Sequence, residues 1–406
     1  MKKLFFLFSI CAVLVSCSTI SIVKKEFSPK IIKEDFFGIH YHDMFEKENK
    51  DLVKITDAKY WRLWDSGTLW ADLEPSNDLW NFERLDFMVE TAKENGIELV
   101  FTLGVGPDWA CKKPIIKSGY GGNSTTSPPY MEHWKDYVKT LGERYKGAIK
   151  YWEIWNEPNF IWFYTGTVGY LADMTKEASV ILKNIDPDNK IVSPSITGWK
   201  GEPFGIWWLD AFLSYGVADF VDIIGFHLYT GKLYQPENMV YHISELKKLL
   251  KRRKIDKPIW NTEGAFTTKN VYGDDAIKAM AKMHIIQLAL NVDRFYWYAF
   301  NNNLFGSLYD KKKKELNKTG EAYISLMKYL IGNKIVNINK KKNAWIVEID
   351  NEGNKEAILW SEKKKEIYKC SDDFIGKKFE NISDGKSFLI ENNNLELGKV
   401  PIIIKF

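Results

Sequence analysis

The sequence lacks the residue patterns that mark several large classes of enzyme. It contains no H-E-x-x-H pair, no cysteine cluster and no aspartate-rich calcium loop, and it therefore predicts no metal site. No glycine-rich phosphate fingerprint opens a predicted helix, and no G-x-S-x-G elbow for acyl transfer is present. We therefore expect chemistry that depends on neither a metal nor a bound cofactor.

Strong net charge and repeats of the solenoid type are also missing. The formal net charge is +4 over 406 residues, which is too small to indicate nucleic acid as a partner. The hydrophobic share of 45% allows a proper core, and the length suits one large domain with a small one. Sixteen tryptophans exceed ordinary packing needs. We expect about half of them to fill the core and the others to stack on the apolar faces of sugars.

The N-terminus has the order of a signal peptide. Two lysines precede the apolar run Leu4–Val15, which is short for a membrane span. The run ends in Leu14-Val15-Ser16-Cys17, which resembles a bacterial lipobox, whose cysteine, here Cys17, is lipidated. An ordinary secretory signal with an incidental cysteine is the alternative. We expect residues 1–17 to be a lipoprotein signal peptide and residues 18–34 a tether. The protein would then be lipid-anchored in the bacterial cell envelope, at the outer membrane or facing the periplasm.

Cysteine is scarce, and the remaining residues of this type allow two interpretations. If the signal is removed at Cys17, Cys11 is lost, and only Cys111 and Cys370 remain of the four cysteines. An exported pair can form a disulfide, but two buried free thiols are equally compatible with the sequence.

Short apolar runs alternate with longer amphipathic segments from Asp35 onward. The predicted strands are Phe36–Tyr41, Tyr60–Trp64, Ile97–Leu103, Ile149–Asn156, Lys190–Ser195, Val221–His227, Lys257–Thr262 and Arg294–Phe300. The predicted helices are Glu46–Asp57, Phe82–Asn95, Tyr130–Tyr145, Thr167–Ile185, Phe204–Tyr215, Glu237–Lys254, Asp274–Leu290 and Gly320–Ile331. Eight strands alternating with eight helices over about 300 residues indicate an α/β fold, the (β/α)8 TIM barrel, which we assign to residues 35–332.

The pattern of the sequence changes after Gly332. Short apolar runs separated by asparagine, glycine and lysine clusters show no helical period, so we interpret residues 333–406 as a small all-β, sandwich-like module beside the barrel. The segment Phe27–Ile32 could add a strand to it. A buttress for the barrel is the favoured role, although Trp345 and Trp360 leave carbohydrate binding open.

Two strand ends carry the residues that we expect to do chemistry. Tyr151–Asn159 (YWEIWNEPN) predicts a buried strand that ends at Pro158, which cannot donate to a ladder, so Glu157 lies at its carboxyl end. A second run, KPIWNTEG, places Glu263 at the end of the seventh strand, across the barrel mouth from the fourth. Acetal hydrolysis uses such a pair, one neutral acid for the leaving oxygen and one carboxylate that attacks or activates water.

These motifs resemble the clan A glycoside hydrolases, and within that clan family 39, which includes β-xylosidases and bacterial exopolysaccharide hydrolases. The resemblance extends as a fold pattern from about Asp35 to Ile331. The resembling segments are Trp61-Arg62-Leu63, Leu73-Glu74-Pro75, Trp80-Asn81-Phe82, Trp155-Asn156-Glu157-Pro158-Asn159, Ile224-Gly225-Phe226-His227 and Trp260-Asn261-Thr262-Glu263.

The resemblance implies a role for each matching residue. Glu157 would be the acid/base and Glu263 the nucleophile, with carboxyl groups about 5–5.5 Å apart because the clan retains anomeric configuration. The substrate-binding residues that it implies are Asn156 at the sugar 2-hydroxyl, Arg62 beside the nucleophile, His227 and Tyr229 flanking it, Trp297 as the floor of a sugar subsite, and His40 at the end of the first strand.

Structural roles stay open for four of these residues. Arg62 could belong to a buried ion pair, His227 and His40 could be core histidines, and Trp297 could be core packing. Outside the strands, the loop Gly104–Pro129 and the stretch Phe160–Tyr164 flank the predicted mouth. Their candidate sugar platforms are Trp109, Tyr120, Trp162 and Tyr164.

We therefore predict a retaining glycoside hydrolase that cleaves a β-linked oligo- or polysaccharide without a cofactor. Its partners would be the glycan and, through the lipid anchor, a membrane. Two alternatives are a transglycosylase with the same site and a non-catalytic glycan-binding lipoprotein, whose barrel has lost its catalytic activity. The sugar, the linkage, endo or exo action and the oligomeric state are left open by the sequence.

Overall fold

A computed structural model describes residues 27–198, 204–231, 235–383 and 385–405 of the chain. The predicted signal peptide, its Cys17 and the first part of the predicted tether lie outside these residues. Within the described ranges, no helix is both long and apolar enough to cross a membrane.

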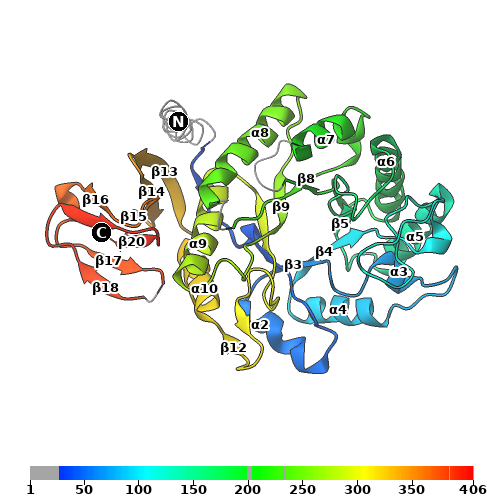
Figure 1. The fold of residues 1–406 in the computed structure, drawn as a ribbon, viewed down its shortest axis with the longest axis horizontal. Coiled ribbons are helices and arrows are strands. Elements are labelled where there is room, and N and C mark those ends of the chain that lie inside the picture. Colours follow the sequence, from blue (N-terminus) through cyan, green and yellow to red (C-terminus); the bar gives the residue numbers. More distant parts are fainter. Residues whose placement is uncertain (1–26, 199–203, 232–234, 384, 406) are drawn as a thin grey trace, which may run out of the picture.

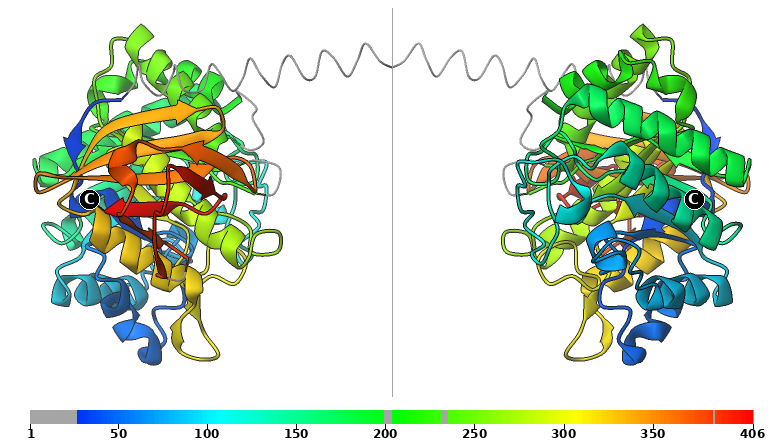
Figure 2. Two further views of the ribbon diagram at one scale, coloured as in Figure 1. Left: turned by 90° about the vertical axis from the view of Figure 1, so that its left-hand side faces the viewer. Right: turned by 90° about the vertical axis from the view of Figure 1, so that its right-hand side faces the viewer.

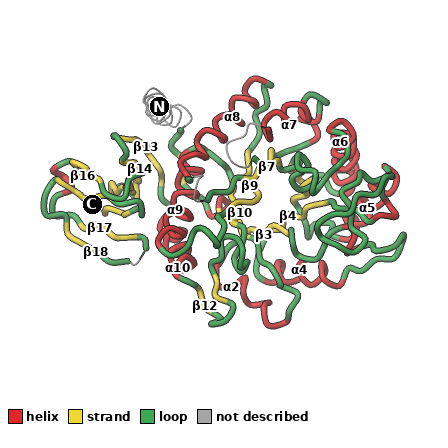
Figure 3. The backbone as a smooth tube through the Cα atoms, viewed as in Figure 1, coloured by secondary structure: helices red, strands yellow, loops and turns green. Residues whose placement is uncertain are grey.

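Parallel strands form a closed barrel at the centre of the larger part of the molecule (Figure 1, Figure 3). The strands are β2 (Phe37–Ile39), β3 (Tyr60–Leu63), β4 (Glu98–Leu103), β5 (Tyr151–Ile154), β6 (Lys190–Val192), β7 (Ile196–Thr197), β8 (Ile224–His227), β9 (Ile259–Gly264) and β10 (Arg294–Trp297). They follow the order β6-β5-β4-β3-β2-β10-β9-β8-β7 in the sheet. Val192 pairs in parallel with Ile223 across the remaining edge, and the Ser193 amide donates to the Ile223 carbonyl (2.9 Å), which closes the barrel.

Nine sheet strands correspond to the eight that the sequence predicts. The predicted strand Lys190–Ser195 is divided into β6 and β7, because Pro194 between them has no N–H to donate to a ladder. The structure confirms the (β/α)8 barrel with a C-terminal β module.

Helices surround the barrel (Figure 1). They are α2 (Val53–Thr56), α3 (Trp70–Leu73), α4 (Glu83–Glu94), α5 (Met131–Arg144), α6 (Val168–Ile185), α7 (Phe204–Leu213), α8 (Met239–Arg252), α9 (Asp274–Ala289) and α10 (Lys318–Leu330). The short α3 was not predicted, and of the predicted helices Glu46–Asp57 differs most from the structure. It is a 3-10 helix (Lys47–Leu52) followed by the short α2, since the run KENKDL offers no apolar stripe and no side chain caps its start.

The C-terminal β module packs on the outer face of α9 (Figure 1, Figure 2). Every residue of α9 from Ala276 to Ala289 is therefore buried, including Lys278 and Lys282. Lys282 Nζ lies 2.7 Å from Glu237 Oε1, and the indole N–H of Trp360 donates to that same oxygen (3.1 Å). A buried ion pair thus lies at the junction of the two parts.

The module consists of two antiparallel sheets. The larger has the order β1-β13-β14-β15-β20-β17-β18, and the smaller pairs β16 with β19. Their strands are β1 (Lys30–Ile31), β13 (Lys334–Lys341), β14 (Ala344–Asn351), β15 (Asn354–Ser361), β16 (Glu366–Lys369), β17 (Lys378–Asn381), β18 (Ser387–Leu389), β19 (Asn394–Leu397) and β20 (Ile402–Lys405). The segment before the barrel does add a strand, with Lys30 opposite Ile335. Strands β16, β17 and β19 were not predictable from apolar runs, since half or more of their residues are polar.

Two open questions about the module and the cysteines are settled by burial. Trp345 and Trp360 stack on each other (ring centroids 5.4 Å apart) with no exposed area, so they are core residues and not platforms for a glycan. Cys111, in the barrel, and Cys370, in the separate core of the module, are both buried and free, so they form no disulfide.

Candidate active site

The strand that carries Glu157 ends in a turn with two left-handed residues. Trp155 has φ +69° and Glu157 has φ +43°, a region that non-glycine residues adopt rarely and often at functional sites. The Glu157 amide donates to the carbonyl of Ser195 (2.9 Å). Asn159 makes two hydrogen bonds with the backbone of Thr197, at 2.8 and 3.0 Å. The turn after β5 is therefore hydrogen-bonded to Ser195 and Thr197 at β7, which fixes the backbone of Glu157.

Glu263 lies near the end of β9, at a point where the sheet is irregular. The pairing of β9 shifts by one residue against β8 and against β10 beside Glu263. Such bulges change the direction of a side chain at a barrel rim. The next residue, Gly264, lies so close to the Leu228 carbonyl that a Cβ would be 2.4 Å from it, so only glycine fits there.

Arg62, on β3, connects the acidic residues beneath the mouth. Its Nη1 donates to Glu263 Oε2 (2.9 Å), its Nη2 to Asn156 Oδ1 (2.7 Å) and its Nε to Glu153 Oε2 (2.6 Å). The side chain has no exposed area. One guanidinium therefore holds three acceptors from two strands in fixed positions, as its planar set of donors allows.

Glu153, on β5, is a third buried carboxylate below the two at the mouth. Besides Arg62, the hydroxyls of Thr102 (2.6 Å), Thr262 (2.8 Å) and Ser195 donate to it. Burial raises the pKa of Glu153, but the charge of Arg62 and these hydrogen bonds together lower it below its usual value. Glu153 is therefore ionised at neutral pH and balances the charge of Arg62.

His227, at the end of β8, lies between Glu157 and this buried network. Its Nδ1 is 2.8 Å from Glu157 Oε1, and its Nε2 is 3.0 Å from the Thr262 hydroxyl. Burial lowers the pKa of His227 to about 4, so the ring is neutral at pH 7. The Thr262 hydroxyl donates to the ionised Glu153, and it must then accept the Nε2 proton. Nδ1 is left as an acceptor that faces Glu157.

The two glutamates differ in their surroundings although both are buried. Burial raises the pKa of Glu157 to about 7, against the opposing effects of a Thr197 hydrogen bond and Arg62. Burial also raises the pKa of Glu263, but Arg62 donates directly to that carboxylate, and so does the hydroxyl of Tyr229. The pair therefore combines a carboxyl group that is half protonated near pH 7 with one that is held as an anion.

The same residues form a cluster with the spacing of metal ligands. One oxygen of Glu157, one of Glu263 and one ring nitrogen of His227 lie within 4.8 Å of one another. The guanidinium of Arg62 already occupies one side of Glu263, and its positive charge opposes a cation there. Glu157, Glu263 and His227 are therefore better suited to holding a titratable proton than to binding a metal ion.

Two predicted substrate-binding residues do not reach the mouth. Trp297 has no exposed area, its indole N–H donates to the Gly306 carbonyl (2.7 Å), and its ring packs on Phe266. The prediction that Trp297 floors a sugar subsite is therefore wrong, because a core ring offers no surface to a ligand. His40 is also fully buried, with Nε2 2.9 Å from the Thr262 carbonyl, and it supports the strand ends.

A cluster at the mouth was not predicted from the sequence. The hydroxyl of Tyr298, the residue after Trp297, donates to Asp65, and Tyr120 from the long loop interacts with the same carboxylate. Asp65 lies two residues after the end of β3 and contributes to the raised pKa of both Glu157 and Glu263. The signal available was a carboxylate just beyond a barrel strand. No sequence signal pointed to Glu153, because it lies within an otherwise apolar strand and not beyond its end.

The rim carries an exposed apolar stretch in the loop after Glu157. Phe160, Ile161 and Trp162 are 41%, 74% and 65% exposed. Of the other candidate platforms, Tyr120 is 40% exposed, whereas Tyr164 is buried. Trp109 is half-buried, and its indole N–H donates to the Glu74 carbonyl (3.2 Å). Trp162 and Tyr120 are therefore the most exposed rings of that set.

Comparison with known proteins agrees with this arrangement. The family model described as glycosyl hydrolase catalytic core matches residues 122–323, which include both glutamates, and that of glycosyl hydrolase family 10 matches residues 36–160. A family 39 glycoside hydrolase from the gut symbiont Bacteroides cellulosilyticus WH2 has a TM-score of 0.71 at 16% identity, over 93% of this chain and 82% of the other. For a family 39 β-xylosidase from Caulobacter crescentus the TM-score is 0.63 at 12% identity, over 94% and 97%.

Sequence relatives match over shorter segments. Mannan endo-1,4-β-mannosidase F of Aspergillus fumigatus is 25% identical over 183 residues, which are 42% of this chain and 40% of the relative. The chain thus spans less than half the length of that relative. By fold and by the arrangement of its strand ends, the chain resembles the clan A glycoside hydrolases. Within that clan it resembles family 39.

Proposed function

We propose that this protein is a retaining glycosidase that cleaves a β-linked oligo- or polysaccharide, with Glu157 as acid/base and Glu263 as nucleophile. The observation that carries the proposal is the asymmetry of the pair. Both carboxylates are buried and their nearest oxygens lie within 4.8 Å, yet only Glu263 receives a hydrogen bond from Arg62. This spacing suits direct attack on the sugar and leaves no room for the intervening water of an inverting site.

The first step transfers a proton and a glycosyl group. Glu157 gives its proton to the glycosidic oxygen as the bond from that oxygen to C1 breaks, and Glu263 attacks C1 to form an ester. The ester carries no charge, but Arg62 stays paired with Glu153 throughout. The guanidinium thus keeps its position while the charge of Glu263 disappears.

The second step reverses these roles. Glu157, now an anion, takes a proton from water, and the resulting hydroxide attacks C1 and releases Glu263. Before the first step, the acceptor Nδ1 of neutral His227 receives the hydrogen bond of protonated Glu157, which fixes the position of the acid. A carboxyl group with a pKa of about 7 suits both directions of transfer near neutral pH.

Asn156 is oriented for one contact with the sugar. Its Oδ1 accepts from Arg62, so its Nδ2 donors are left to face the mouth. The side chain has 1% exposure, and its place beside Glu157 suits a hydrogen bond to the 2-hydroxyl. That contact strengthens as the transition state forms.

The substrate class that we propose is a β-linked glycan of the xylan or mannan type. A relative named as a mannan endo-1,4-β-mannosidase and neighbours named as a β-xylosidase and a family 30 endoxylanase support this class.

Proton NMR of the first product tests the proposal. The purified chain is incubated with aryl β-xylosides, aryl β-mannosides and the corresponding polysaccharides, beside a Glu263→Ala control. We expect release of a β-anomer that the control does not produce. Initial release of the α-anomer would contradict retention, and saturable binding without turnover would favour a glycan-binding protein. Product transfer to an added sugar acceptor in preference to water would favour a transglycosylase.

We also propose that Cys17 is lipidated and anchors the protein in a bacterial cell envelope. The support is the Leu-Val-Ser-Cys sequence after a charged and apolar N-terminus. Expression with radiolabelled palmitate should label the wild type and not Cys17→Ser. Equal absence of label from both would contradict lipidation.

A further inference from the structure

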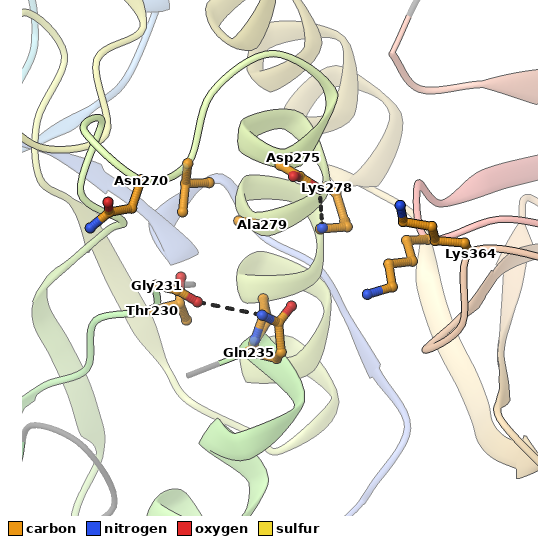
Figure 4. A pocket seen from close by; sticks show the side chains of 11 residues that line it. Thr230, Gly231, Gln235, Asn270, Asp275, Lys278, Ala279 and Lys364 are labelled. Atoms are coloured by element: carbon orange, nitrogen blue, oxygen red, sulfur yellow. Dashed lines mark hydrogen bonds and ion pairs between the residues drawn. The ribbon is translucent and has the colours of Figure 1, made fainter. Parts of the chain in front are cut away.

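A second pocket lies where the barrel meets the β module. It has a volume of about 330 Å³, within the range of sites that bind small molecules. The residues that line it are Thr230, Gly231, Gln235, Pro236, Asn270, Val271, Asp275, Lys278, Ala279, Lys364 and Lys399. The first nine belong to the barrel and the last two to the module, so the pocket exists only because the two parts are packed together (Figure 4).

Positive charge dominates this pocket. Three lysines line it against a single carboxylate, that of Asp275. Lys278, on α9, is buried and forms an ion pair with Asp275. Lys364 and Lys399 approach from the module, and among the described residues no carboxylate lies within ion-pair distance of either. Lys278, and after it Lys399 and Lys364, lower the pKa of the Asp275 carboxyl group, so three ammonium groups share one carboxylate. The pocket therefore has an excess of positive charge, beside the side-chain amide of Asn270.

The pocket belongs to the same face of the barrel as the two glutamates. Thr230 directly follows Tyr229, whose hydroxyl donates to Glu263. Asn270 follows Glu263 by seven residues (270 − 263) in the loop before α9. The loops that follow β8 and β9 therefore line this pocket as well as carrying residues of the mouth.

We propose that this pocket binds a carboxylate group of an acidic glycan and acts as a remote subsite for a uronic acid residue. Ammonium groups form strong, charge-assisted hydrogen bonds with carboxylates, and the side-chain amide of Asn270 can bind sugar hydroxyls. The inference rests on the proposed glycosidase function and adds to it the charge of the substrate. A solvated lysine run is the plain alternative for Lys364, but it does not account for a cavity that lysines of both parts line together.

Calorimetric binding tests the pocket independently of catalysis. The ligands are a β-linked oligosaccharide that contains glucuronate, its carboxyl-reduced counterpart, and inorganic sulfate. The proteins are the full chain, the double variant Lys364→Ala/Lys399→Ala, and the control Lys363→Ala/Lys365→Ala. The control removes the same two charges from neighbouring exposed lysines that do not line the cavity.

We expect the acidic oligosaccharide to bind the wild type about tenfold more tightly than its reduced counterpart. The variant Lys364→Ala/Lys399→Ala should lose that preference, and the control should keep it. Equal affinity for both sugars, loss of the preference in the control, or binding of sulfate alone would overturn the assignment. Binding does not need turnover. Failure of the glycosidase proposal in the product assay can therefore be distinguished from failure of the binding proposal in calorimetry.

Discussion

Arg62 Nε lies 2.6 Å from Glu153 Oε2, and neither side chain has any exposed area. This pair lies beneath the two carboxylates at the barrel mouth, and water neither hydrates nor screens its charges. If Glu263 were its only partner, the buried Arg62 would be left without a counter-charge whenever Glu263 became esterified. Glu153 supplies a permanent second charge, so the geometry around Glu263 does not depend on the charge of Glu263.

Arg62→Lys should therefore be far from conservative. An ammonium cannot reproduce three directed hydrogen bonds to Glu153, Asn156 and Glu263. We expect kcat/KM to fall about 100-fold and the free energy of unfolding to fall by about 3 kcal/mol. Steady-state kinetics and urea denaturation measure the two effects. Arg144→Lys, at an exposed pair with Asp86, is the control and should change stability by less than about 1 kcal/mol.

Glu157→Gln should affect substrates according to their leaving groups. A glycoside with a poor leaving group needs the proton of Glu157, whereas an activated aryl glycoside does not. We expect kcat/KM to fall about 1,000-fold on the first and about tenfold or less on the second. A series of aryl glycosides of different phenol pKa gives the slope. Equal losses along the series would contradict the acid/base role.

The pH dependence of the reaction follows from the same residue. Activity requires a protonated Glu157, so kcat/KM should fall as pH rises through about 7, the pKa to which burial raises this group. It requires an ionised Glu263, so it should also fall at acid pH, above the usual range of a glutamate because burial raises that pKa too. A bell-shaped profile is expected, and its basic limb should disappear in Glu157→Gln. A basic limb that persists in the variant would assign it to another group.

The stability of the protein should respond to pH through Glu157 as well. Its pKa is raised in the folded state from 4.5 to about 7, so the folded state binds more protons than the unfolded state between these values. The stabilisation is present below pH 4.5 and is lost as pH rises through 7, by about 3 kcal/mol. Glu157→Gln lacks this loss. The difference in melting temperature between variant and wild type should grow from pH 5 to pH 9, and a constant difference would exclude the raised pKa.

The junction between barrel and module should depend on the pair of Lys282 and Glu237. Both side chains are nearly buried, at 3% and 10% exposure. Lys282→Met leaves the Glu237 charge uncompensated and should cost about 3–5 kcal/mol. Lys282→Met with Glu237→Leu should recover most of that loss. Trp360→Phe removes the hydrogen bond to Glu237 and part of the ring that stacks on Trp345, so it should cost about 2–3 kcal/mol. Additive effects of the paired substitutions would show that the residues act independently.

Trp162 should matter for long substrates only. Its ring is 65% exposed in the loop after Glu157, and stacking on a sugar contributes about 1 kcal/mol. Trp162→Ala should raise KM for a polysaccharide about fivefold to tenfold and leave an aryl monoglycoside nearly unchanged. Trp207→Ala is the control, with 66% exposure on α7. A similar rise in the control would mean a general loss of folded protein.

The barrel and the two glutamates were predictable from the sequence because both depend on local patterns. Strand ends such as that of β5 are marked by an apolar run that stops at a proline, and Glu157 is fixed by its place next to that stop. The C-terminal strands β16 and β17 had no such mark, since at least two of the four residues in each are polar and no apolar run is present. Their pairing depends on neighbours distant in sequence.

The tertiary structure alone decided which groups are hydrogen-bonded through a titratable proton and which form ion pairs. Glu153 looks like an interruption in an apolar strand, and only the approach of Arg62, 91 residues earlier in the chain, gives it a function. Trp297 and Tyr298 are adjacent, yet the first is core and the second faces Asp65, because successive strand residues point to opposite sides and the sheet bulges at this point. Sequence alone determined the fold and the residue types at the strand ends, since these follow from hydrophobic period and chain stops. Protonation, pairing and exposure depend on distances between segments, which only the closed barrel and the docked module define.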